Sequence, residues 1–208
     1  MVVVTALGAA ALVLLLVSDR RGGTLHRPAK VATSICFIAV VLIAGALDTG
    51  YGQWVLIALL LSAVGDTALL GSSSSMFLLG LGSFLLAHLA YVVAFVVRGV
   101  DAAPTAIAAG GLVVPIVVVI RWLWPHVPAA MQRPVGAYAV IISLMVAGAV
   151  GTVAAEGDAR ILVAAVAFYV SDLAVARNRF VAPGFDNRLW GLPLYYVGQF
   201  LFAWSVAI

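Results

Sequence analysis

The stretch Trp54-Val-Leu-Ile-Ala-Leu-Leu-Leu-Ser-Ala-Val-Gly-Asp66-Thr-Ala-Leu-Leu70 contains one charged side chain in 17 residues. An α-helix of about 17–25 mostly apolar residues is long enough to cross a lipid bilayer. The stretch therefore predicts a membrane span. Because a carboxylate inside a bilayer costs at least about 2.5 kcal/mol, Asp66 is a candidate functional residue.

The same pattern recurs along the whole chain. Of its 208 residues, 65% are hydrophobic and 9% are charged, and the mean hydropathy is +1.20. Average soluble domains carry about 25% charged residues, so the composition excludes a soluble domain, a disordered chain, a coiled coil and a nucleic-acid-binding protein. Eight apolar runs predict eight transmembrane helices in an all-α, polytopic membrane protein: Val2–Val17, Val31–Leu47, Trp54–Leu70, Met76–Val97, Ala102–Ile120, Val135–Ala155, Ile161–Ala176 and Leu189–Ile208. Only short loops remain, so we expect a single integral membrane helical domain over residues 1–208.

The loops differ strongly in positive charge. Those after the first, third, fifth and seventh runs contain nine Lys and Arg residues, and the other loops contain two. Cytoplasmic loops carry the excess of Lys and Arg in membrane proteins. The sequence therefore predicts that the nine-residue side is cytoplasmic and that both termini lie outside. The first run could instead be a signal peptide, but no basic residues precede its apolar part, which favours a helix.

Two acidic residues, Asp66 and Asp172, lie inside the predicted spans. Each precedes the cytoplasmic end of its run by four residues, which is about 6 Å along a helix. The small residues Gly65 and Ser171 stand directly before them and allow close approach of a neighbouring helix or a substrate. Two carboxyl groups at one depth in a low dielectric can divide into one acid and one base, as general acid–base catalysis requires. The alternative for each aspartate is a structural hydrogen bond between helices.

Six uncharged polar side chains inside the spans share helix faces at i, i+3 or i, i+4 spacings with one another or with Asp172: His88, Tyr91, Tyr169, Tyr195, Tyr196 and Gln199. Interhelical hydrogen bonding is the alternative to a functional role for each of them. An aspartate followed by a polar residue in the next span occurs twice, with His88 after Asp66 and with Gln199 after Asp172. This order is compatible with parallel four-helix repeats.

The sequence contains no HExxH, GxSxG or phosphate-binding-loop motif. Its three histidines are scattered, and its one cysteine lies inside an apolar run. We therefore predict no metal site and no cofactor.

Five segments together resemble the YhhN family, whose animal members are lysoplasmalogenases: Ser62–Leu70, Gly82–Tyr91, Phe168–Asp172, Asn178–Phe180 and Tyr195–Gln199. The resemblance covers the chain from Lys30 to its C-terminus and implies an eight-helix membrane protein. It also implies a lysophospholipid substrate among membrane lipids, in a plasma (inner) membrane of the bacterial type. It does not indicate an oligomeric state.

The resemblance implies hydrolysis of the vinyl ether of a one-chain phospholipid to a fatty aldehyde and a glycerophospho-base. By this reading Asp66 and Asp172 are the catalytic acid and base, in an undetermined order. His88, Tyr91, Tyr195, Tyr196, Gln199 and Asn178 would orient the carboxyls, the water and the lipid head, with Tyr169 beside Asp172. Lys30 and Arg179 could bind the phosphate. The alternative for both is positive-inside anchoring.

Three other functions fit the same residues. A small-molecule or proton-coupled transporter also needs carboxylates inside the membrane, but it predicts a polar path to both faces. A non-catalytic lipid-binding protein could use the same pocket. A hydrolase of another ether or ester lipid would fit a host without plasmalogens.

Overall fold

The computed structural model describes residues 1–207, and within them the chain is helical with no strand. Eight α-helices follow one another: α1 (Val2–Arg20), α2 (His26–Ile43), α3 (Gly50–Ala68), α4 (Ser74–Arg98), α5 (Ala102–Leu123), α6 (Ala129–Glu156), α7 (Ala159–Ala176) and α8 (Phe185–Trp204). A 3₁₀ turn, η1 (Trp124–His126), precedes α6, and a π-helical turn, η2 (Arg177–Val181), follows α7.

Polar side chains cap the N-terminal ends of four helices. Thr49, Ser73, Asp101 and Asp158 each accept a hydrogen bond from a backbone N–H in the first turn of the helix that follows. Such caps satisfy amide groups that have no partner inside the helix. Helix α6 spans 28 residues and begins after Pro128 without a side-chain cap.

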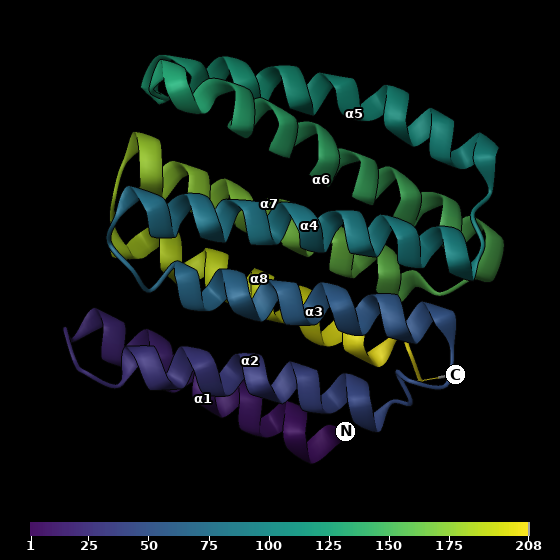
Figure 1. The fold of residues 1–208 in the computed structure, drawn as a ribbon, viewed down its shortest axis with the longest axis horizontal. Coiled ribbons are helices and arrows are strands. Elements are labelled where there is room, and N and C mark those ends of the chain that lie inside the picture. Colours follow the sequence, from purple (N-terminus) through teal and green to yellow (C-terminus); the bar gives the residue numbers. More distant parts are fainter. Residues whose placement is uncertain (208) are drawn as a thin grey trace.

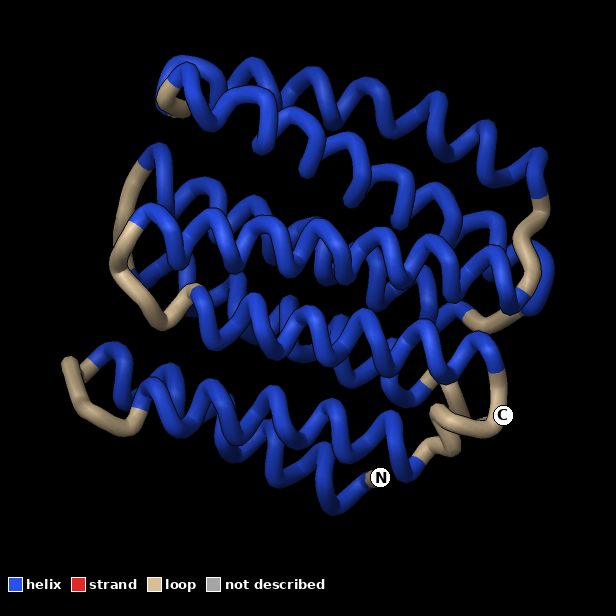
Figure 2. Tube along the Cα trace, in the orientation of Figure 1, coloured by secondary structure: helices blue, strands red, loops and turns tan. Residues whose placement is uncertain are grey.

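Consecutive helices pack as antiparallel pairs, α1 with α2, α3 with α4, α5 with α6, and α7 with α8 (Figure 1). Helix α4 joins the third pair through α6, and α8 also contacts α1, α2 and α3. Both chain ends lie at the same end of the bundle (Figure 1). The connections are short at both ends (Figure 2), so the loops after α1, α3, α5 and α7 share the opposite end.

Seven of the helices in the described part of the chain, α1 to α7, are long and apolar enough to cross a membrane. They make the chain an integral membrane protein. The prediction of eight spans holds for the number of long helices, but α8 does not reach the apolarity of a span. The polar residues Asn187, Arg188 and Gln199 lower its hydropathy, and Asn187 and Gln199 are buried against other helices. The last predicted run ended at Ile208, which lies outside the described residues.

Candidate functional site

A cavity of about 510 Å³ opens at the end of the bundle that holds the loops after α1, α3, α5 and α7. All eight helices contribute to its wall. Asp66 and Asp172 both line it, together with five of the other predicted residues: Lys30, Tyr169, Asn178, Arg179 and Tyr195. The structure thus brings together two acidic residues that are 106 positions apart in the sequence.

Asp66 lies near the C-terminal end of α3 and is 3% exposed. The Nζ atom of Lys30 is 3.3 Å from its Oδ1 atom. Its Oδ2 atom accepts hydrogen bonds from the hydroxyls of Ser34, at 2.7 Å, and Tyr195, at 2.8 Å. A cation and two hydroxyl donors suit a carboxylate, because a buried charge is tolerated when it is paired and hydrogen-bonded.

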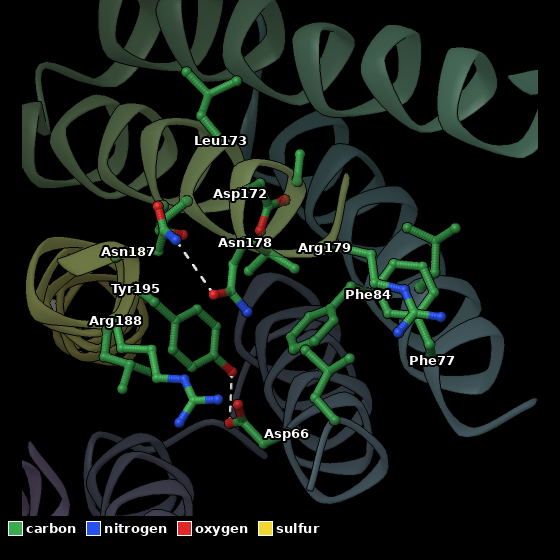
Figure 3. A pocket seen from close by; sticks show the side chains of 18 of the residues that line it. Asp66, Phe77, Phe84, Asp172, Leu173, Asn178, Arg179, Asn187, Arg188 and Tyr195 are labelled. Atoms are coloured by element: carbon green, nitrogen blue, oxygen red, sulfur yellow. Dashed lines mark hydrogen bonds between the residues drawn. The ribbon is translucent and has the colours of Figure 1, made fainter. Parts of the chain in front are cut away.

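Asp172 lies near the C-terminal end of α7 and has a different environment. Its Oδ2 atom accepts a hydrogen bond from the Tyr138 hydroxyl at 2.6 Å, and His88 Nε2 lies 3.7 Å away. Within residues 1–207, no Lys or Arg forms an ion pair with Asp172. Figure 3 shows Asp172 and Asp66 on different walls, with Tyr195 directed at Asp66.

Three aromatic rings form a cluster next to the residues that contact Asp66 and Asp172. Phe84, Phe168 and Tyr195 contact one another edge to face, with centroid distances of 5.8 Å for Phe84–Tyr195, 6.1 Å for Phe84–Phe168 and 5.4 Å for Phe168–Tyr195. The His88 ring lies on Phe168 at 4.4 Å. Phe84 can take this position because Gly65 has no side chain. A Cβ at Gly65 would lie only 2.6 Å from the Phe84 ring. The small residue before Asp66 therefore serves close packing, as the sequence predicted.

The π-helical turn η2 and the start of α8 form another wall. Asn178 Oδ1 accepts hydrogen bonds from the backbone N–H of Gly184 at 3.0 Å and from Asn187 Nδ2 at 3.2 Å. Asn187 is 2% exposed and also donates to the carbonyls of Ala182 and Gly184. Its Oδ1 accepts from the Arg177 guanidinium. These bonds fix the loop between α7 and α8.

The remaining predicted residues lie outside the cavity wall. His88 is fully buried behind Asp172. Tyr196 is buried and donates to the Lys30 carbonyl at 3.3 Å. The Tyr91 hydroxyl donates to Gln199 Oε1 at 2.8 Å, and both side chains are inaccessible to solvent.

Three residues that contact the predicted set were not singled out from the sequence: Ser34, Tyr138 and Asn187. Ser34 could have been found, because it follows Lys30 by four residues and so shares its helix face. Tyr138 is the one tyrosine of its predicted span, and only the packing of α6 on α7 directs it at Asp172. Asn187 lies in the polar first turn of α8 and has no distinguishing sequence signal.

In the described part of the chain, no three His, Cys, Asp or Glu side chains are grouped so that they could hold a metal ion. The cavity does contain two groups that can exchange protons. These are the side chain of Asp66, which is paired with Lys30, and that of Asp172, which is hydrogen-bonded to Tyr138.

Comparison with known proteins matches the YhhN family to residues 25–206. Lysoplasmalogenases from Mycobacterium bovis and Mycobacterium tuberculosis are each 32% identical to this chain over 194 residues, which cover 86% of the chain and 68% of the relative. Lysoplasmalogenase TMEM86A from Bos taurus is 30% identical over 158 residues, which cover 73% of the chain and 64% of the relative. No solved structure matches the chain. With a family match across most of its length, this chain belongs to the YhhN family.

Proposed function

We propose that this protein hydrolyses the vinyl ether bond of lysoplasmalogen-type lysophospholipids, releasing a fatty aldehyde and a glycerophospho-base. The relatives named lysoplasmalogenase support an enzyme of this class. One structural observation carries the proposal: Asp66 and Asp172 line the same cavity, which opens at one end of the bundle.

The cavity fits a molecule with a polar head and one apolar chain. Helices α5 and α6 contribute apolar side chains to it: Val119, Leu123, Val135 and Ile142. Helices α1, α2 and α8 contribute polar ones: Asp19, His26, Lys30, Asn187 and Arg188. We place the hydrocarbon chain against these apolar side chains and the head toward the end of the bundle where η2 and the start of α8 lie.

The chemistry needs a proton donor and a base. A proton added to the outer vinyl carbon gives an oxocarbenium ion, and water then adds to the carbon next to oxygen. The resulting hemiacetal breaks into the aldehyde and the alcohol. Glycosidases use two carboxyl groups for a similar oxocarbenium-like transition state.

The contacts of the two aspartates suggest which one is the proton donor and which one is the base. Asp66 is paired with the Lys30 ammonium, so we assign it the carboxylate that stabilises the cation and takes a proton from water. Asp172 has Tyr138 and His88 as its neighbours and no lysine or arginine partner among the described residues. An unpaired charge is costly in a buried site, so we assign Asp172 the proton donor.

The position along the bundle supports a reaction near a headgroup. The cavity lies at the end that holds most of the Lys and Arg residues. By the positive-inside rule this end faces the cytoplasm. The vinyl ether of a lipid lies just below its headgroup, so we propose that substrate enters from the cytoplasmic leaflet.

The core beyond the site favours hydrolysis over transport. A transporter needs a polar path to both faces of the membrane. Toward the other face, the fully buried rings of Tyr91, Phe95 and Phe202 pack together, with 4.0 Å between the Tyr91 and Phe202 centroids. This apolar layer supports a pocket that is open on one side.

Aldehyde release from a lysoplasmalogen by purified protein in detergent tests the proposal. We expect activity from the wild type and a loss of at least about 100-fold in Asp66→Asn and in Asp172→Asn, because each removes a proton-transfer group. Asp48→Asn is the matched control, since Asp48 is an exposed acid at the far end of the bundle. Retained activity in either site variant would refute the catalytic pair, and an inactive wild type would refute the substrate assignment.

A further inference from the structure

Three cationic side chains line the cavity, and two of them are already paired. Lys30 lies 3.3 Å from Asp66. Arg188 forms an ion pair with Asp19. Arg179, by contrast, makes no ion pair with any residue that the structure describes. The positive charge of Arg179 is thus the one in this wall that has no protein counter-ion.

Contacts with an aromatic ring hold Arg179 in place. The centre of its guanidinium lies 4.5 Å from the centroid of the Phe77 ring (Figure 3). The neighbouring Phe180 packs edge to face on the same ring at 5.9 Å. Phe77 is buried in the first turns of α4. A guanidinium held over a ring can keep N–H groups free, which suits a planar pair of hydrogen bonds to phosphate.

The residue before Arg179 offers a second donor. Asn178 Oδ1 is occupied by the two hydrogen bonds from Gly184 and Asn187. Its Nδ2 group makes no hydrogen bond with residues 1–207, and Figure 3 shows it directed toward the space between Tyr195 and Phe84. Since an amide nitrogen can only donate, this group suits an anion.

Asn187 sets this orientation through its own hydrogen bonds. It is 2% exposed and ties η2 to α8 through Asn178, Ala182, Gly184 and Arg177. If Asn178 turned its amide over, two nitrogens would face each other and the bond to Asn187 would be lost. Asn187 therefore fixes which end of Asn178 points into the cavity.

We propose that Arg179 and the Asn178 amide bind the phosphate of the substrate head, and that Asn187 is the positioning residue for this site. The inference rests on the proposed function for the identity of the substrate. It assigns Lys30 to Asp66 rather than to phosphate. The shared chemistry is a phosphate anion, which a lipid head or free phosphate could supply.

Two substrates of equal chain length test it, an alkenyl-glycerophosphocholine and the matching alkenyl-glycerol, which lacks the phosphate. For the first, we expect Arg179→Gln and Asn178→Asp to raise KM about 10- to 100-fold, because each removes a charge-assisted hydrogen bond. Asn187→Ala should raise the same KM, and Arg179→Lys should restore part of the loss. For the second substrate, kcat/KM should change less than about threefold. Arg121→Gln is the control, since Arg121 is exposed and outside the cavity.

Equal losses on both substrates would overturn the phosphate site and assign these residues a structural role. A wild type that cleaves neither substrate would refute the proposed function and leave the site testable by binding. The probes are then saturated alkyl-ether analogues with and without phosphate, measured by the shift in Tm. Stabilisation of the wild type, but not of Arg179→Gln, by the phosphate-bearing analogue alone supports a lipid phosphate. The same pattern with millimolar inorganic phosphate supports a free-phosphate site, and equal stabilisation by both analogues overturns the proposal.

Discussion

Asp66 and Asp172 carry the same side chain but have different neighbours. Asp66 has a lysine and two hydroxyl donors, whereas Asp172 has one tyrosine hydroxyl and a buried histidine ring. Two carboxyl groups in unlike environments can take opposite roles in acid–base catalysis. This difference, and not the presence of two acids alone, supports the proposal that Asp172 donates the proton and that Asp66 acts as the carboxylate.

Tyr138 is the residue whose role at Asp172 can be tested most directly. Tyr138→Phe removes the 2.6 Å hydrogen bond but keeps the ring. We expect kcat to fall about 10- to 100-fold with little change in KM, because a hydrogen bond to a charged or reacting carboxyl contributes about 1.5–3 kcal/mol. Steady-state aldehyde release measures both constants.

Tyr51→Phe is the matched comparison for that change. Tyr51 is also buried, and its hydroxyl is 2.6 Å from the Ser205 hydroxyl, but it lies at the opposite end of α3 from Asp66. It should lower the free energy of unfolding by about 1 kcal/mol and leave kcat unchanged. Similar kcat losses in both variants would contradict a specific role for Tyr138.

At the scale of elements, the packing of α7 on α8 builds most of the site. The pair brings Asp172 and Tyr195 to one cavity and holds η2 between them. Close contact depends on Gly191, where a Cβ would lie 2.5 Å from the Cβ of Ala174. Neither atom belongs to a flexible side chain, so the helices themselves would have to separate.

Gly191→Ala should therefore destabilise the protein, by about 1–3 kcal/mol for an overpacked contact. Because the displacement moves α8 relative to α7, aldehyde release should fall as well. Thermal unfolding in detergent, followed by circular dichroism, measures the first effect.

Gly110→Ala provides the control for that substitution. A Cβ at Gly110, in α5, meets no atom within 4 Å, so the change should be neutral or stabilising by up to about 1 kcal/mol from helix propensity. A Tm for Gly191→Ala at or above the wild-type value would show that this crossing tolerates a methyl group.

At the scale of the whole molecule, the bundle has a polar site at one end and a charged cluster at the other. We call this cluster of Arg98, Asp158 and Arg160 the clasp. Arg98 donates to the Ser205 carbonyl and to Asp158, and Arg160 donates to the Trp204 carbonyl and to Asp158. The two arginines thus satisfy carbonyls at the C-terminal end of α8 that have no partner within the helix. Asp158 links them to the start of α7.

The clasp predicts a pH dependence of stability. Burial raises the pKa of Asp158, but the hydrogen bonds and charge of Arg160 and the charge of Arg98 outweigh it, so this pKa lies below its ordinary value of 3.8. A lowered pKa stabilises the folded state above the ordinary value, and this stabilisation disappears as pH falls through the lower one. Asp158→Asn should lower stability by about 1 kcal/mol at pH 7, the range of a partly exposed pair.

Tm measured from pH 7 down to about pH 3 checks this prediction. The difference between wild type and Asp158→Asn should shrink toward the acid end, whereas Asp48→Asn should follow the wild type. A difference that stays constant with pH would mean that the clasp stabilises by packing and not by charge.

The sequence by itself determined the helical class and most helix positions, because the length and apolarity of a run decide whether it can cross a bilayer. It also identified Asp66 and Asp172, since charges are rare inside such runs, and Lys30 and Tyr195, which contact Asp66 in the structure. It did not distinguish α8 from the seven spans. This helix resembles a membrane span in its apolar half, and the partners of its polar residues Asn187, Arg188 and Gln199 lie in η2, in the loop before α8 and in other helices.

Only the tertiary structure decided which of these residues meet. Helical periodicity fixes which side chains share a face, but not which helix that face contacts, and this depends on the fit of side chains between helices. Tyr195 and Tyr196 are neighbours in sequence, yet one faces Asp66 and the other the backbone of α2. Tyr138, in α6, contacts Asp172, in α7. Asn187, at the start of α8, orients Asn178 in η2. These contacts arise from packing between distant segments, which no local pattern of residues specifies.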